Sequence, residues 1–362
     1  MKSCNFTLSD VNPFNAGRVR SASWLFLSAL LIAGCATIQD RSSDVSDAAD
    51  PDATDTSDFS GYSQEIPETD VTIEMVPIEG GTFLMGRSSD EEGKASHEGP
   101  QREVSVNSFW MSSHEITWEQ YKLFTEEVVE EEIGEEVLEA FGIDADAIAT
   151  PSPPWGDGAF GMGENGRPAI SMTHYAAVVY AMWLTARTGE FHRLPTEAEW
   201  EYACRGGAES SYYFGDDLDE LDDYEWYRDN SEGSYGRVAE KKPNPFGLYD
   251  MMGNVAEWTM DQFHEDYHEK LDGDIVDNPL FLPEVLYPRA VRGGSWRDDA
   301  EDIRCTHRRG STERWSRDDP QIPKSMWWHT NAPIVGFRII RPKETPSREE
   351  MEKYWIMPIL DI

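Results

Sequence analysis

Apolar and polar residues alternate in two short segments, which is the pattern of strands that bury one face. The first segment covers residues 71–76 and the second covers residues 104–111. From Thr117 the spacing becomes that of an amphipathic helix, because Tyr121 and Phe124 fall on one face. The ordered part of the chain is therefore expected to begin with the first of these strands.

Two further helices carry clear end signals. Residues 174–187 are expected to form a helix that ends at Gly189, and Thr196 with Glu199 forms a capping box that starts another. Beyond them the chain consists mostly of short runs broken by glycine, asparagine, aspartate and proline. This pattern predicts one irregular α+β domain over residues 71–345, with little regular secondary structure.

The first 34 residues have the composition of an export signal. Two arginines precede an apolar run over residues 24–33, which is too short to span a bilayer, and small residues lead directly to Cys35. This pattern resembles a bacterial lipoprotein signal over residues 1–34, with Cys35 as the lipidated first residue. The alternative is an ordinary signal peptide in which Cys35 is incidental. Ala36 after the cysteine favours the outer membrane over the inner one.

The two flanks of the domain are expected to lack a fold of their own. Residues 35–70 contain ten acidic side chains and one basic side chain, with no apolar period, and therefore predict a disordered tether. Residues 346–362 are expected to form a C-terminal tail. The whole chain is then a cell-envelope lipoprotein whose contact with the membrane is the lipid anchor alone.

The charge of the chain excludes one class of partner. With 69 acidic and 31 basic residues the formal net charge is -38. A field of this sign repels nucleic acids and anionic headgroups, so a nucleic-acid partner is not expected. Hydrophobic residues make up 39% of the chain, which is enough for a core.

Five motifs follow one another along the chain. They are residues 77–86 (PIEGGTFLMG), 193–203 (RLPTEAEWEYA), 244–258 (NPFGLYDMMGNVAEW), 292–296 (RGGSW) and 336–338 (GFR). In this order they resemble the sulfatase-modifying factor, or formylglycine-generating enzyme, family with its FGE-sulfatase domain. The resemblance covers about residues 74–342 and implies that family's irregular, C-type-lectin-like α+β fold.

The third motif contains a turn rich in oxygen ligands. Asp250 and Glu257 flank a Gly-Asn pair that allows a tight turn, and such hard ligands suit calcium. In the family, the matching positions hold a structural calcium ion through the side chains of Asp250 and Glu257 and the carbonyls of Gly253 and Val255. The resemblance therefore implies calcium as a cofactor, whereas the alternative is a metal-free turn packed around Trp258.

The reaction centre of the family is altered in this chain. The enzymes bind copper(I) through two cysteines that lie three and eight residues beyond the serine of the RGGSW motif. Here those positions are Asp298 and Ile303. Copper is therefore not expected, because a hard carboxylate is a poor ligand for this soft ion and an isoleucine is none at all.

Cys204 and Cys305 are the thiols that remain in the domain. In an oxidising compartment a disulfide between them is possible, but their spacing does not prove it and nothing local favours it. By the resemblance, Cys305 fits a structural cysteine of the family at least as well as a catalytic one. No positioned base that would activate it is identifiable.

A second cluster of chemistry-bearing residues lies in the C-terminal region that forms the substrate groove of the family. Aromatic walls with a few polar groups suit an extended peptide or a glycan. The alternative is that the tryptophans stabilise a core poor in regular structure and that the histidines are structural. The candidate groove residues are Arg292, Ser295, Trp296, Asp298, His307, Arg308, Trp328 and His329.

His264 and His268 would share one face of a helix, as transition-metal ligands do. Because no third ligand accompanies them, surface positions are the favoured interpretation.

Two kinds of function are consistent with these features. The first is a family lipoprotein that binds a peptide or glycan and lacks copper-dependent formylglycine generation. The second is an oxidoreductase of the formylglycine-generating or non-haem metal oxidase type that acts on a protein substrate. The altered cysteine positions favour the first.

Overall fold

The computed structural model describes residues 59–88, 96–126, 151–154, 156–215 and 217–355. Cys35, the predicted signal peptide and most of the predicted tether lie outside these residues. Within them no helix is long and apolar enough to cross a membrane.

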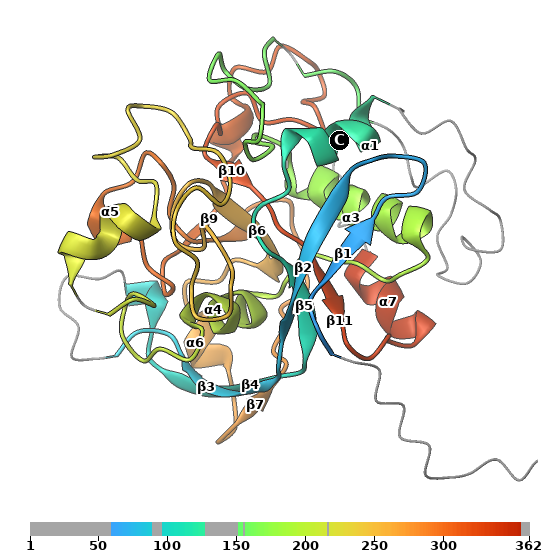
Figure 1. Cartoon of the computed structure of the whole chain (residues 1–362). Coiled ribbons are helices and arrows are strands. Elements are labelled where there is room, and N and C mark those ends of the chain that lie inside the picture. Colours follow the sequence, from blue (N-terminus) through green and yellow to red (C-terminus); the bar gives the residue numbers. More distant parts are fainter. Residues whose placement is uncertain (1–58, 89–95, 127–150, 155, 216, 356–362) are drawn as a thin grey trace, which may run out of the picture. The chain divides into compact units, whose positions relative to one another are not determined.

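The first sheet joins strands from both ends of the domain. Its order is β1-β2-β5-β11 and every pairing is antiparallel (Figure 1). The strands are β1 (Tyr62–Glu65), β2 (Thr72–Ile78), β5 (Phe109–Ser112) and β11 (Ile340–Pro342). The alternation seen in residues 71–76 is reproduced in β2, where Ile73 and Met75 are buried and Glu74 is exposed.

Two smaller sheets hold the middle of the chain. One has the order β10-β6-β8-β9 and consists of β10 (Val335–Gly336), β6 (Ala256–Gln262), β8 (Arg289–Arg292) and β9 (Arg308–Gly310). The other has the order β3-β4-β7 and consists of β3 (Gly81–Met85), β4 (Arg102–Val106) and β7 (Val276–Asp277). All seven residues of β6 are buried, so this strand lies in the interior rather than at the surface.

Each of the three principal helices begins directly after a threonine whose side chain caps its N-terminus. Thr117, Thr173 and Thr196 each accept a hydrogen bond from the backbone at the start of a helix, and Glu199 completes the predicted capping box. Gly189 ends the second helix in the left-handed conformation, as expected. These helices are α1 (Trp118–Thr125), α3 (His174–Thr188) and α4 (Glu197–Arg205); shorter ones are α5 (Leu221–Tyr224), α6 (Tyr267–Lys270) and the 3-10 turns η1 (Ser96–Glu98), η3 (Leu218–Glu220), η4 (Ala300–Asp302) and η5 (Glu313–Ser316).

Two apolar clusters form the core. One surrounds α1 and α3 and contains Tyr121, Tyr180 and Trp258. The other surrounds α4 and contains Trp200 and Ile303. The observed arrangement is the predicted one, with few helices and several small sheets.

Regular structure extends beyond both predicted boundaries of the domain. Strand β1 lies inside residues 35–70, which the composition assigned to a disordered tether, and it pairs with β2 over its whole length. Helix α7 (Arg348–Trp355) lies inside the predicted tail and packs beside α3 (Figure 1). Both additions are held by aromatic contacts, because Tyr62 packs on Trp110 and Trp355 packs on Phe191. Most other residues of these two segments are polar or charged, so composition alone did not predict the strand and the helix.

Candidate functional site

Two of the predicted groove residues, Arg292 and Arg308, are fully buried in an ion-pair network beside α4. Arg292 contacts Glu197 at 3.3 Å and Glu201 at 2.5 Å, and Arg308 contacts Glu197 at 2.5 Å. Burial would raise the pKa of both glutamates, but the neighbouring arginines hold each pKa below its ordinary value. These arginines therefore join β8 and β9 to α4 and do not line a groove.

Three other predicted groove residues meet in a small, partly buried polar cluster. Ser295 donates a hydrogen bond to Asp298 at 2.6 Å, and Arg309 forms an ion pair with the same carboxylate at 2.7 Å. Burial by itself would raise the pKa of Asp298, but the charge of Arg309 and the hydrogen bond from Ser295 outweigh it, so the pKa lies below its ordinary value. The side chain of His307 contacts Arg309 through Nε2 at 3.1 Å. The carboxylate of Asp298 is thus already hydrogen-bonded to Ser295 and ion-paired with Arg309.

The predicted aromatic walls belong to the core. Trp296 and Trp328 are both buried, and their indole N–H groups donate to the main-chain carbonyls of Pro333 and Ser152. Trp328 also stacks on Trp118 with ring centroids 6.3 Å apart. The interpretation of these tryptophans as core residues is the one that the contacts support.

Asp298 and Ile303 are the positions that the resemblance matches to the copper-binding cysteines of the family. Ile303 is fully buried in the core around α4, and Asp298 is occupied by Ser295 and Arg309. Cys305, two residues beyond Ile303, forms a disulfide with Cys204. No cysteine in the part of the chain that the structure describes therefore offers a free thiolate, which is the ligand that copper(I) prefers.

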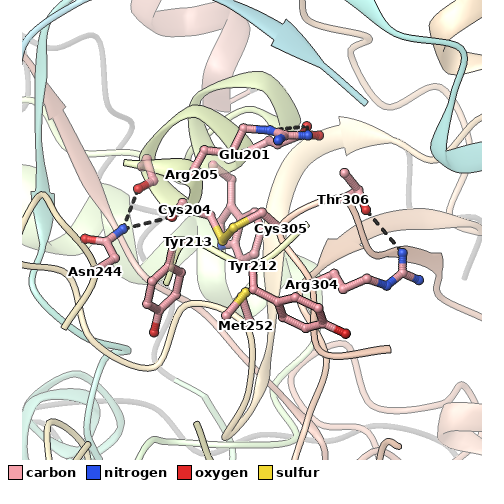
Figure 2. The surroundings of a disulfide bond; sticks show 12 residues. Glu201, Cys204, Arg205, Tyr212, Tyr213, Asn244, Met252, Arg304, Cys305 and Thr306 are labelled. Atoms are coloured by element: carbon pink, nitrogen blue, oxygen red, sulfur yellow. Dashed lines mark hydrogen bonds and ion pairs between the residues drawn. A yellow bond between two sulfur atoms is a disulfide. The ribbon is translucent and has the colours of Figure 1, made fainter. Parts of the chain in front are cut away.

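The disulfide joins the last turn of α4 to the segment before β9 (Figure 2). Its Cα atoms are 5.6 Å apart although 101 positions separate the two cysteines in sequence. Tyr212, Tyr213 and Met252 surround it, and the Asn244 amide donates to the carbonyl of Cys204 at 3.0 Å. Residue spacing did not favour this pairing, because the two cysteines are 101 positions apart and only the folded domain brings them together.

A cavity of about 1070 Å³ lies elsewhere, between the start of α3, strands β6 and β8, and the loops at residues 283–287 and 311–327. Of the predicted groove residues only His329 is among those that line it. The walls include His174, Trp258, Tyr287, Arg289 and Trp327. Its size lies at the upper end of the range for small-ligand sites.

The rim of this cavity is apolar and exposed. The exposed fractions of Val285, Leu286 and Ile322 are 53%, 40% and 98%. Apolar side chains that gather around an opening mark a binding surface more strongly than isolated ones do. Residues 280–287 are apolar except for Glu284 and have neither helical nor strand periodicity, and this stretch was the available signal in the sequence.

The histidines of the cavity are neutral. His174 Nε2 lies 2.9 Å from the carbonyl of Thr259, and His329 Nδ1 lies 2.8 Å from the hydroxyl of Ser316. Burial lowers the pKa of each imidazole to about 3, aided at His174 by the charge of Arg289. Imidazoles with a pKa this low are poorly suited to act as general acids near pH 7.

The predicted calcium turn lies directly before β6. Asp250 is fully buried with φ of 55°; one carboxylate oxygen accepts from the Ala239 amide at 2.8 Å and the other has no partner among the described atoms. Glu257 is already engaged, since both of its oxygens accept from Arg338 at 2.7 and 2.8 Å. At Gly253 a side chain would collide with the carbonyl of Trp226, which explains the glycine.

Two further carboxylates that the sequence analysis missed lie near this turn. Glu115 is fully buried and neither of its oxygens has a partner within the described structure. Burial raises its pKa, and the charges of Asp250 and Glu257 raise it further. Burial and Asp250 likewise raise the pKa of Glu225 to about 8. Glu115, Glu225 and Asp250 each have at least one carboxylate oxygen without a partner in the described structure. Buried carboxylates that repel one another and leave oxygens unpartnered fit a bound cation.

A complete set of side-chain ligands is not present at any single point. Among the described residues no three histidine, cysteine, aspartate or glutamate side chains converge as metal ligands do. The expected calcium set is compatible with this, since it uses two side chains and the carbonyls of Gly253 and Val255. His268 is buried near Glu201 rather than exposed, so the surface interpretation of this histidine was wrong, and it does not pair with His264 as a metal site.

Comparisons with known proteins give a consistent result. The model of the sulfatase-modifying factor enzyme 1-like domain matches residues 62–320. Formylglycine-generating enzyme of Thermomonospora curvata is 29% identical over 255 residues, covering 61% of this chain and 82% of that protein. Inactive C-alpha-formylglycine-generating enzyme 2 of Bos taurus is 27% identical over 278 residues, covering 67% and 84%.

Serine/threonine-protein kinase pkn1 of Chlamydia caviae is 32% identical over 246 residues, or 68% of this chain. The chain spans only 36% of the length of that relative. Among solved structures, PvdO from Pseudomonas aeruginosa matches with a TM-score of 0.57 and 24% identity, covering 78% of this chain and 98% of PvdO. This likeness, together with the family match, confirms the predicted fold.

Proposed function

The chain belongs to the sulfatase-modifying factor family, and from this premise we propose that it is a ligand-binding lipoprotein that does not generate formylglycine. One observation carries the proposal. Ile303 and Asp298 occupy the two positions of the copper-binding cysteines, and the nearby Cys305 is held in a disulfide with Cys204. Without a pair of thiolates the domain has no soft site for copper(I). That the family contains a relative named as inactive is consistent with this.

The cavity supports binding as the retained activity. It is lined by aromatic residues, its rim is apolar, and a few polar groups reach its walls. This combination suits an extended peptide or a glycan, whose apolar faces pack on aromatic rings. The proposed binding site is therefore the cavity beside His329 and not the predicted groove around Arg292 and Arg308.

Anchoring in the cell envelope forms the second part of the proposal. Cys35 follows an apolar segment and small residues, and a buried disulfide in the domain suits an oxidising compartment. Replacing Cys35 by alanine should release the protein from the membrane fraction and abolish incorporation of a lipid label. Unchanged fractionation of Cys35→Ala, with no lipid label on the wild type, would contradict the anchor.

Calcium forms the third part. Asp250, through its unpartnered oxygen, would hold the ion together with Glu257 and the carbonyls of Gly253 and Val255, while Glu115 would add negative charge beside it. A bound divalent cation would neutralise carboxylates that burial otherwise destabilises. Its role would be structural, because the turn lies at the start of β6 and apart from the residues that line the cavity.

Mass spectrometry of a sulfatase peptide that contains the target cysteine tests the absence of formylglycine generation. The peptide is incubated with the full chain, with and without copper, and a formylglycine-generating enzyme serves as the positive control. We expect the thiol mass to persist. Conversion of the thiol to an aldehyde by the unmodified chain would overturn the proposal. The variant Asp298→Cys with Ile303→Cys shows separately whether two thiolates restore copper binding.

A further inference from the structure

Arg289 is the first residue of β8 and lines the cavity. It is only 2% exposed, so its charge has been removed from water. Side chains alternate between the two faces of a strand, and Arg292 of the same strand points into the ion-pair network beside α4. Arg289 therefore belongs to the opposite face, toward the cavity.

Arg289 differs from the other buried arginines in what surrounds its guanidinium. The described part of the chain buries seven arginines, and six of them contact a glutamate. Arg289 has no carboxylate partner there, and its Nη1 is buried without any hydrogen-bond acceptor. Burial alone lowers its pKa to about 10. The paired arginines are Arg193, Arg205, Arg292, Arg304, Arg308 and Arg338.

The other charged side chains of the cavity do not replace the missing partner. Glu313 lines the cavity but is exposed and makes no contact with Arg289. Arg317 is exposed and pairs with Asp318, and Lys324 donates to the carbonyl of Arg317 at 3.2 Å. These groups stand in water, so the buried positive charge of the wall remains uncompensated.

From this geometry we propose that the cavity binds a ligand that has a carboxylate and an apolar portion. Arg289 would bind the carboxylate, and the apolar rim would pack against the apolar portion. A guanidinium offers two parallel N–H donors that match a carboxylate. A single buried cation balances a single negative charge, so a monocarboxylate fits better than a phosphate dianion. The C-terminus of an apolar peptide provides this chemistry, and a fatty acid provides it as well.

This inference rests on the proposed binding function and specifies a chemical group that the ligand must carry, a carboxylate. The test uses two matched pairs of probes, each differing in charge and not in apolar body. One pair is the peptide acetyl-Leu-Phe-Leu as the free acid and as its C-terminal amide, and the other is dodecanoate and dodecanol. Binding to the full chain is measured by isothermal titration calorimetry.

For the wild type we expect at least one acid to bind roughly tenfold more tightly than its uncharged partner, as one ionic hydrogen-bonded contact provides. Arg289→Met should remove this preference. Arg317→Met is the control, since it removes an exposed arginine of the same cavity, and it should keep the preference. The pair that shows the effect identifies the ligand source as peptide or lipid.

The outcomes are distinguishable from a failure of the proposed function. If acid and uncharged partner bind equally, or if Arg289→Met keeps the preference, the anion site is wrong while ligand binding stands. If none of the four probes binds, the anion site is wrong as well. Conversion of a sulfatase peptide to formylglycine is a separate result and concerns only the loss of catalysis. A thermal unfolding curve of Arg289→Met confirms that the variant is folded.

Discussion

The two faces of β8 bury arginines in opposite ways. On one face Arg292 contacts Glu197 and Glu201 and also donates to the carbonyl of Cys305 at 2.9 Å. On the other face, three residues earlier, Arg289 reaches a cavity wall without a carboxylate partner in the described structure. Both side chains are at most 2% exposed, so burial by itself does not distinguish them.

The difference separates buried charges that the fold itself compensates from buried charges that it leaves uncompensated. A buried charge destabilises the protein unless a partner compensates it. The network beside α4 compensates its charges internally and acts as structure. The cavity wall and the turn at Asp250 leave charges uncompensated, and these are the two places where we propose a ligand and an ion. The following changes test this distinction, beginning with the largest expected effect.

Replacing Arg292 by methionine should be the most destabilising change. It leaves Glu201 and Glu197 buried with fewer cations, and breaking one side of a buried pair costs about 4 kcal/mol. The free energy of unfolding is measured in urea. Arg228→Met removes an exposed ion pair with Asp299 and is the control, with an expected loss below about 1 kcal/mol. Equal losses in the two variants would mean that the network is not structural.

Removing the disulfide should have the next largest effect. Cys204→Ala with Cys305→Ala should lower the free energy of unfolding by about 3 kcal/mol, because the bridge restricts a long loop in the unfolded chain. The same loss should follow when the wild type is unfolded in reductant, and reductant should leave the double variant unchanged. A reductant effect on the double variant would assign the loss to another cause.

Calcium should stabilise the turn at Asp250. At a hundredfold excess over its dissociation constant, an ion that binds only the folded state adds about 2.7 kcal/mol. Chelation should therefore lower the melting temperature of the wild type and leave that of Asp250→Ala unchanged. If chelation lowers both melting temperatures equally, the ion is not held by this carboxylate.

The pH dependence of the metal-free protein should separate paired from unpaired carboxylates. Burial raises the pKa of Asp250 to about 7 and those of Glu225 and Asp261 to about 8, whereas the arginines keep those of Glu197 and Glu201 low. Between pH 5 and 7 the folded state then holds protons that the unfolded state has lost. Each raised group therefore makes the free energy of unfolding fall as pH rises, by at most about 1.4 kcal/mol per unit. Buried histidines such as His174 and His329, whose pKa burial lowers to about 3, contribute in the opposite sense below the pKa of the unfolded imidazole.

Urea unfolding of the chelated protein at pH 5, 6 and 7 measures this slope. Glu225→Gln should make the slope more positive by removing one of the raised groups, while the contribution of the histidines stays the same. An identical slope in the wild type and in Glu225→Gln, both free of metal, would show that this carboxylate is already ionised in the folded protein over this range.

Replacing Arg289 by methionine should change stability least. The substitution exchanges an unpaired buried charge for an apolar side chain of similar length, so the free energy of unfolding should stay within about 1 kcal/mol of the wild type. Together with Arg292→Met this gives the most direct test, because both arginines stand on one strand. A loss as large as that of Arg292→Met would mean that Arg289 serves the fold and not a ligand.

Local features were predictable from the sequence because they depend on neighbouring residues. The capping box of Thr196 and Glu199 and the stop at Gly189 use contacts within a few positions, and both were predicted correctly. The five motifs also led to the right family and fold, since their order reflects the arrangement of the whole domain.

The candidate groove was not predictable in the same way. Whether an arginine such as Arg292 lines a groove or closes an ion pair depends on Glu197 and Glu201, which lie more than ninety positions away. The same holds for the disulfide and for the cavity, whose lining residues come from segments spread between Ser152 and Tyr354. Residue type and spacing identified candidate chemistry but not its partners.

The topology of the first sheet also determines how much of the chain must be synthesised before the sheet can close. Strand β5 pairs with β2 on one side and with β11 on the other. Ile340 of β11 pairs with Met111 of β5, which lies 229 positions earlier in the chain, so the sheet can close only after β11 has been made. Until then β5 presents an open edge of hydrogen-bonding groups, which is prone to wrong pairing. Because so much of the chain must be present before the sheet closes, folding is expected to follow synthesis rather than accompany it. Late folding would suit the proposed export, because a chain that has not yet folded can pass through a narrow translocation channel.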